Sequence, residues 1–158
     1  MNSDIKLGAI FPQTEIGLDP LDIREYILAV ERLDFDYILA FDHVLGADVS
    51  NRPNWVGPYT QQHSFLEPFV LFAYMAAITS TIELATGIII LPQRQTALAA
   101  KQASTLDVLS NGRLRLGIGI GWNSVEYEAL GEDFSNRGIR SEEQVDVMRA
   151  LWTNQTIS

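Results

Sequence analysis

The sequence predicts an α/β fold in which a strand and a helix alternate four times along a parallel sheet. The first observation is a set of short apolar runs typical of buried strands, at 5–11, 37–41, 82–91 and 113–121. The second is that a segment with helical spacing or helix end signals follows each run. This alternation indicates parallel strands joined by right-handed crossovers. The chain has 158 residues, 47% of them apolar, which is enough for one domain with its own core.

The elements of the first half begin and end at recognisable residues. Pro12 stops the strand at 5–11, and Asp19 followed by Pro20 is typical of a helix N-cap and first turn. Apolar side chains then recur at helical spacing over 20–33, at Ile23, Ile27, Val30 and Leu33. Asp34, which follows, can adopt the left-handed conformation at a cost. A strand at 37–41 and a long polar loop at 44–66 come next, and loops of that length are usually functional or disordered.

The second half continues the same alternation. The segment 68–80 is apolar almost all round, which predicts a helix buried on every side. A strand at 82–91 ends at Pro92, and the helix at 96–109 stops at Ser110-Asn111-Gly112, where Asn and Gly accept the left-handed conformation. After the strand at 113–121, Asn123 begins a helix with Glu126 three residues on, an arrangement similar to a capping box. A last helix is predicted over 139–152.

Two architectures fit this order: an open, doubly wound sheet, or half of an eight-stranded βα barrel. In both, ligands bind at the carboxyl ends of the strands. The same positions are therefore candidates either way, namely Phe11, Gln13, Asp42, His43, Gly87 to Gln93, and Gly121, Trp122 and Asn123.

Charge and composition exclude several classes of function. The net charge of −9 argues against nucleic acid and anionic membranes as partners. The absence of cysteine excludes disulfides and thiolate chemistry, and the two histidines, His43 and His63, lack the spacing of a metal site. The longest apolar run, 68–78, is shorter than the roughly 20 residues that span a bilayer. No secretory signal is visible, so we expect a cytoplasmic protein.

Two local patterns could carry chemistry. Gly117, Gly119 and Gly121 leave one side of a strand bare, which suits either a flat cofactor ring or a crowded barrel interior. Asp42 and His43 follow a buried strand, and histidine is the side chain best suited to proton transfer near neutral pH. The alternative is structural: Asp42 caps a loop and His43 packs against a helix. Arg94 could hold an anion, although an arginine in a loop is more often simply solvated.

Four segments together resemble the N-terminal half of the bacterial luciferase-like flavin and deazaflavin oxidoreductases. They are "FDHV" at 41–44, "LATGIIILPQR" at 84–94, "AKQASTLDVLSNGRLRLGIGIGW" at 100–122 and "EYEALGEDFSNRGIRSEEQVDVMRALW" at 126–152. Within that group the chain is most similar to the deazaflavin-dependent branch. The resemblance implies a single domain over 1–158, a βα barrel of the TIM type that stops after its fourth βα unit.

The resemblance also implies a cofactor, either FMN or the deazaflavin F420, bound at the carboxyl face of the barrel. Asp42 and His43 would be the catalytic residues beside the reactive ring. The cofactor-binding residues would be Phe11, Asp42, His43, Gly87, Ile88, Gly121, Trp122 and Asn123, with a non-proline cis peptide at about Gly87–Ile88. Trp55 and Tyr59, in the loop at 44–66, would contact a small organic substrate that is oxidised by hydride transfer or with oxygen.

The sequence departs from the family pattern in three ways. Asp34 replaces a frequent glycine, Trp122 stands where some deazaflavin dehydrogenases have a glutamate, and the second half of the barrel is absent. A half barrel leaves two unpaired strand edges and an open apolar interior, so we expect a homo-oligomer that covers them. The alternative function is that of a non-catalytic half-barrel remnant, acting as an oligomeric or cofactor-binding protein.

Overall fold

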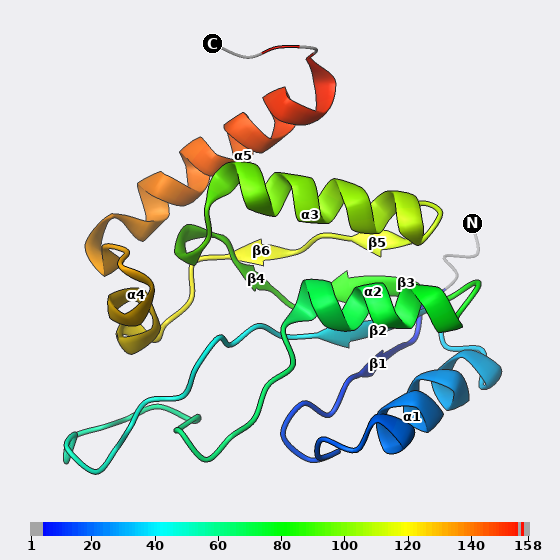
Figure 1. Ribbon diagram of the computed structural model, residues 1–158, viewed down its shortest axis with the longest axis horizontal. Helices are drawn as coiled ribbons and strands as arrows, with labels where there is room; N and C mark the ends of the chain where they lie inside the picture. Colours follow the sequence, from blue (N-terminus) through cyan, green and yellow to red (C-terminus); the bar gives the residue numbers. More distant parts are fainter. Residues whose placement is uncertain (1–4, 155, 157–158) are drawn as a thin grey trace.

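The computed structural model describes residues 5–154 and 156. Four parallel strands form the main sheet in chain order: β1 (Gly8–Ile10), β2 (Tyr37–Ala40), β3 (Glu83–Thr86) and β5 (Leu114–Arg115). A second, two-stranded parallel sheet pairs β4 (Ile89–Ile90) with β6 (Ile118–Gly119). Figure 1 shows the two sheets running in the same direction, with β6 beyond the end of β5.

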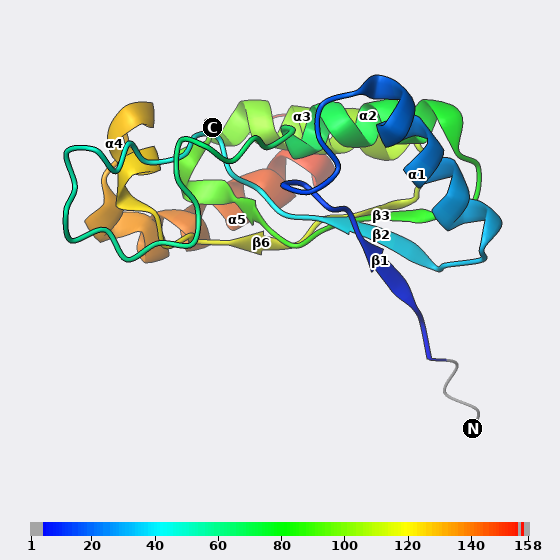
Figure 2. The ribbon, with the colours of Figure 1, turned by 90° about the horizontal axis from the view of Figure 1, so that it is seen from below.

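The helices distinguish between the two predicted architectures. Four of them lie on one side of the sheet, as Figure 2 shows: α1 (Pro20–Arg32), α2 (Pro68–Ile78), α3 (Thr96–Leu109) and α5 (Arg137–Thr153). A short helix, α4 (Ser124–Leu130), lies past the end of β6, and two 3₁₀ turns cover Leu91–Gln93 and Phe134–Asn136. A doubly wound sheet carries helices on both faces and reverses its strand order. This sheet does neither, so the prediction of a partial βα barrel is confirmed.

The helix ends follow the predicted signals. Asp19 caps α1, with Oδ1 accepting a hydrogen bond from the Leu21 amide at 2.8 Å. Asp34 and Asn111 adopt the left-handed conformation, with φ of 57° and 58°, and Gly112 follows Asn111 with φ of 77°. These predictions are confirmed because turn chemistry is a local property of the chain.

One prediction about burial is wrong. Helix α2 is not buried on every side: Val70 is 69% exposed, whereas Phe72 and Met75 on the opposite side are fully buried. The helix lies in the outer layer, so only the face toward the sheet enters the core. Because this helix is apolar on both sides, its sequence does not indicate which side packs against the sheet. Among the described residues, no helix is both long and apolar enough to cross a membrane.

The two long strands predicted at 82–91 and 113–121 are each interrupted. The Thr86 hydroxyl lies at the break, where it donates to the Gly117 carbonyl at 2.7 Å and accepts from the Gly117 amide at 2.7 Å. The Gly117 amide thus bonds to a side chain instead of a main-chain carbonyl before β4 and β6 begin. The cis peptide expected at Gly87–Ile88 is not present, because the described residues contain only trans peptides. The amides on either side, of Gly87 and Ile89, bond to the Ala40 and Gly117 carbonyls instead.

The core lies between the helices and the sheet. Buried side chains from α1, α2, α3 and the central strands pack there, among them Ile27, Phe72, Leu106, Ile38 and Leu84. Arg113, just before β5, lies at the end of this layer where the strands begin. Its guanidinium donates to the carbonyls of Ala76, Thr79, Ile82 and Ser110 and to the Thr79 hydroxyl. One side chain therefore satisfies the end of α2, the end of α3 and the start of β3.

We predict that Arg113→Ala lowers the free energy of unfolding by about 2–3 kcal/mol, because carbonyls that the guanidinium satisfies lose their donor. The matched control is Arg115→Ala, two residues on. Arg115 is exposed and pairs with Glu83, a surface ion pair worth less than about 1 kcal/mol. Urea denaturation followed by circular dichroism measures both variants. Equal losses in the two variants would contradict this role for Arg113.

Candidate functional site

The carboxyl ends of the strands enclose a pocket of about 250 Å³. It is lined by Phe41, Asp42, His43, Gly87, Ile88, Ile90, Gly119, Ile120, Gly121 and Trp122. Six of the eight predicted cofactor-binding residues therefore meet there. Two others do not reach the pocket wall: Phe11 is fully buried against Tyr26, and Asn123 is buried as the N-cap of α4.

His43 is one of two ionisable side chains among the lining residues, the other being Asp42. His43 is 7% exposed, and aromatic rings surround it, with centroids at 4.8 Å (Tyr59), 4.9 Å (Phe65) and 5.8 Å (Trp122). Its Nδ1 lies 3.0 Å from Oε1 of Glu126. An ionised carboxylate only accepts hydrogen bonds, so Nδ1 is the donor when Glu126 is charged.

The spacing of Asn123 and Glu126 predicted an arrangement similar to a capping box, and that prediction is wrong. The Asn123 side chain caps α4 by accepting from the Val125 amide, but the Glu126 carboxylate turns away from the helix terminus. It is fully buried and accepts from His43 and from the amides of Val44 and Leu45, while its second oxygen faces Gln93. One feature of the sequence could have indicated this role: Glu126 lies in the helix that directly follows a predicted strand, at the edge of the sheet where ligands bind.

Asp42 contacts Arg94 rather than its neighbour His43. Both carboxylate oxygens of Asp42 lie 2.9 Å from Nη2 of Arg94, and Oδ2 also accepts from the Ile90 amide at 3.0 Å. Arg94 reaches Glu67 through its other terminal nitrogen at 2.8 Å. The expectation of a solvated arginine is therefore wrong, since the Arg94 side chain is 14% exposed and holds two carboxylates.

Burial and neighbouring charges have opposite effects on the pKa values of Asp42 and Arg94. Burial raises the pKa of Asp42, and the opposing effects of the Arg94 guanidinium and the Ile90 amide offset this only in part. Burial also favours the neutral form of Arg94, but Asp42 and Glu67 outweigh it and raise the arginine pKa above its usual value. Arg94 thus stays charged, and it stabilises the ionised form of Asp42.

The bare side of the glycine strand is filled by the neighbouring strand. A β-carbon on Gly119 would lie 2.6 Å from the Ile88 side chain, and one on Gly121 would lie 2.8 Å from that of Ile90. Of the two uses predicted for these glycines, close packing accounts for the contacts observed. The strand end is further fixed by the buried Tyr127, whose hydroxyl donates to the Ile120 carbonyl at 2.5 Å. Burial raises the pKa of Tyr127 to about 12, so this donor keeps its proton.

The loop at 44–66 brings its two predicted aromatic residues against side chains that line the pocket. Tyr59 lies against His43, and Trp55 lies 5.8 Å from Trp122, measured between ring centroids. Gly57 fits between the two tryptophans, because a β-carbon there would lie within 2.6 Å of both rings. The loop therefore contacts the pocket wall through aromatic side chains.

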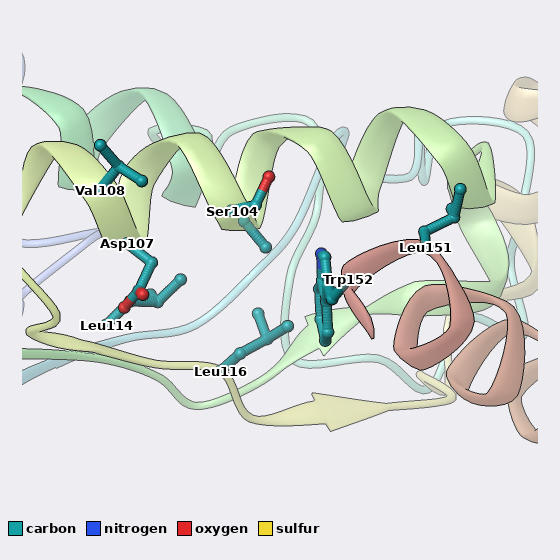
Figure 3. Close-up of a pocket in the computed structure, with 8 residues that line it drawn as sticks. Ser104, Asp107, Val108, Leu114, Leu116, Leu151 and Trp152 are labelled. Atoms are coloured by element: carbon teal, nitrogen blue, oxygen red, sulfur yellow. The ribbon is translucent and has the colours of Figure 1, made fainter. Parts of the chain in front are cut away.

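A larger cavity, of about 590 Å³, lies elsewhere, between α3, α5 and β5 (Figure 3). Its lining is Ala103, Ser104, Asp107, Val108, Leu114, Leu116, Leu151 and Trp152, with no residue shared with the pocket at His43. Apolar side chains dominate the lining, and it adjoins β5, which has no partner strand on its outer side within the described sheet. We therefore interpret it as a packing surface rather than as the site of chemistry.

We predict that Arg94→Met lowers the free energy of unfolding at neutral pH by about 3–5 kcal/mol, because the buried Asp42 charge loses its partner. The Asp42 pKa then rises further, so the folded state binds a proton at pH values where the unfolded chain has lost it. The loss relative to wild type is therefore largest where Asp42 is ionised in the wild-type fold, and it shrinks as the pH falls through the raised wild-type pKa of Asp42, below which both folded chains are protonated.

Denaturation curves from about pH 4.5 to about pH 7.5 measure this dependence, because the range starts just above the ordinary carboxyl pKa and extends to neutrality. The matched control is the double variant Arg94→Met with Asp42→Asn, which removes the charge and should recover most of the loss at pH 7. A deficit that does not change with pH would contradict the assignment to Asp42.

Comparison with known proteins places this geometry in a family. The family model for luciferase-like monooxygenases matches residues 8–158. The pyrimidine monooxygenase RutA of Pseudomonas syringae is 34% identical over 136 residues, which cover 82% of this chain and 35% of RutA.

Two solved structures share the fold. One is an F420-dependent secondary alcohol dehydrogenase in complex with an F420–acetone adduct (TM-score 0.75, 20% identity, covering 97% of this chain and 43% of that one). The other is the oxygenating constituent of 3,6-diketocamphane monooxygenase of Pseudomonas putida in complex with FMN (TM-score 0.74, 19% identity, covering 96% and 40%). The chain spans about a third of the length of the curated relative and about two fifths of each solved one. It belongs to the luciferase-like monooxygenase family.

Proposed function

We propose that the pocket at His43 binds the ring of FMN or F420 and that the chain contributes to oxidation or reduction of a small organic molecule. The observation that carries this proposal is the placement of His43. It lines a concave site at the carboxyl ends of parallel strands, the position where βα barrels hold their ligands. The relatives that bind FMN or an F420 adduct support the choice of cofactor class.

The pocket suits a planar ring better than a complete nucleotide. Its volume of about 250 Å³ lies just below the roughly 300–1,000 Å³ of typical ligand sites. Backbone of the glycine strand and the side chains of Ile88, Ile120 and Trp122 form an apolar wall for one ring face. The side-chain amide nitrogen of Asn123 is buried without a partner nearby. No lysine or arginine is among the residues that line the pocket, so a phosphate would need a cation from elsewhere.

The chain's own residues would supply orientation and a proton. A bound flavin or deazaflavin carries the electrons or the hydride. His43 would exchange a proton with substrate or cofactor, and Asp42, held by Arg94, would fix the end of β2 that carries His43. Trp55 and Tyr59 would contact an apolar substrate at the pocket mouth.

We predict saturable, one-site binding when FMN or F420 is titrated into the purified chain and followed by cofactor fluorescence. The chain has only two histidines, His43 and His63, so their ring ¹⁵N signals can be followed individually. Binding in the proposed pocket should shift the His43 signals more than those of His63. Absence of binding to either cofactor would favour the alternative of a non-catalytic half barrel, and a larger His63 shift would place the ligand elsewhere.

We predict that His43→Ala changes the cofactor dissociation constant little and lowers turnover by roughly 10²-fold or more, as for loss of an acid–base group. The reason is that the ring would bind mainly to the apolar wall, whereas the imidazole would move the proton. Stopped-flow oxidation of the reduced cofactor with a screened substrate measures turnover. His63→Ala is the matched control, and unchanged turnover in His43→Ala would reject the role.

We also propose that the chain self-associates. Parallel sheets are covered on both faces in folded proteins, but the helices described here cover one face only (Figure 2). The β1 edge carries exposed apolar side chains, including Leu7 at 63% and Ile10, and the β5 edge adjoins the cavity of Figure 3. A second copy whose strands run the same way could pair β1 of one protomer with β5 of the other.

We predict a dimer or larger species by light scattering coupled to size exclusion. Leu7→Lys should shift it toward the monomer, because a charge then lies at the β1 edge. Val56→Lys is the matched control, since Val56 is exposed on the loop at 44–66, far along the chain from both edges. A wild-type monomer at all concentrations would overturn the proposal.

A further inference from the structure

Glu126 is a buried carboxylate whose hydrogen bonds all involve groups near His43. It is fully buried at the start of α4, and Oε1 accepts from the Val44 amide at 2.9 Å and the Leu45 amide at 3.4 Å besides its contact with His43 Nδ1. Oε2 lies 3.3 Å from Nε2 of Gln93. Among the described residues, His43 is the only group in ion-pair range of Glu126 that can become positively charged.

The geometry assigns different tautomers to the two histidines. His43 Nδ1 faces a carboxylate, an acceptor, and must carry the proton. His63 Nδ1 instead accepts from the Thr60 amide at 3.1 Å, so its proton belongs on Nε2. His43 Nε2 has no hydrogen-bond partner among the described residues, and the ring that carries it lines the pocket.

We infer that Glu126 is a positioning residue that holds His43 in the Nδ1–H tautomer and so leaves Nε2 as the proton acceptor toward the pocket. Asp42, the neighbouring carboxylate in sequence, cannot do this, because Arg94 and the Ile90 amide occupy its oxygens. The use of Nε2 in catalysis rests on the proposed function, whereas the tautomer itself is a property of the unliganded chain.

In the proposed transfer, a proton leaves the reacting group and binds Nε2 of His43. Nδ1 keeps its own proton and donates to the Glu126 carboxylate before and after the transfer. The imidazolium that forms lies 3.0 Å from a carboxylate that is shielded from water. A nearby opposite charge in a weakly polar environment stabilises such a cation more than it would in water. The amides of Val44 and Leu45 hold the carboxylate in place, so the ring keeps one orientation before and after transfer.

The test is ring ¹⁵N NMR of the untagged chain, recorded over a rising pH series until the ring ¹⁵N shifts of both histidines no longer change, so that the neutral form of each ring is observed. We expect a protonated Nδ1 and an unprotonated Nε2 for His43, and the reverse for His63, with signals assigned through a His63→Gln variant. A wild-type His43 protonated on Nε2 would overturn the inference outright.

Three variants test whether Glu126 sets the tautomer of His43 or only stabilises the fold. Glu126→Leu removes the acceptor, and His43 should shift toward Nε2–H. Glu126→Gln keeps an acceptor oxygen but loses its charge, so the Nδ1–H signal should persist and move upfield as the bond loses charge assistance. Glu128→Gln, at an exposed position of the same helix, should leave both histidines unchanged.

An unshifted His43 spectrum in Glu126→Gln would overturn the inference even if Glu126→Leu fails to fold. Failure of FMN or F420 to bind would leave the tautomer result standing, so the two proposals fail separately. If the wild type binds cofactor, Glu126→Gln should lower turnover and change the dissociation constant little, as expected for a residue that acts through His43.

Discussion

The buried Glu126 carboxylate connects the parts of the chain that form the site. It joins the start of α4 to the segment after β2 through His43, Val44 and Leu45, and to the 3₁₀ turn after β4 through Gln93. These segments are more than 30 residues apart in sequence. A buried charge is costly unless donors surround it, so the segments must come together for this carboxylate to be satisfied.

Arg94, the residue after Gln93, connects other segments of the site in a similar way. It ties Asp42, after β2, to Glu67, at the N-cap of α2, and it follows directly on Gln93. Arg94 thus contacts Asp42 directly. Gln93, the residue before it, is connected to His43 through Glu126. The buried acidic groups at this edge are therefore engaged in internal hydrogen bonds and ion pairs, whereas Nε2 of His43 has no partner among the described residues.

Side chains also replace main-chain pairing where the strands break. The Thr86 hydroxyl bonds to both the amide and the carbonyl of Gly117, and that carbonyl also accepts from the Ile89 amide. Arg113 satisfies carbonyls at the end of the core where the strands begin. The break lets β4 and β6 diverge from the main sheet while the backbone stays hydrogen-bonded. The pocket lies beside this divergence, with Gly87 and Ile88 in its wall.

The sequence by itself determined the alternation of strands and helices, the caps at Asp19 and Asn123, the left-handed positions at Asp34 and Asn111, and the edge of the sheet where Asp42 and His43 lie. These features depend on periodicity and on the conformational preferences of single residues. Only the tertiary structure decided that all the main helices cover one face, that Thr86 interrupts two strands, that Arg94 is committed to Asp42, and that Glu126 rather than Asp42 contacts His43. The reason is that a buried polar side chain takes whichever donor or acceptor the packed chain brings within about 3 Å, and that distance is set by folding rather than by position in the sequence.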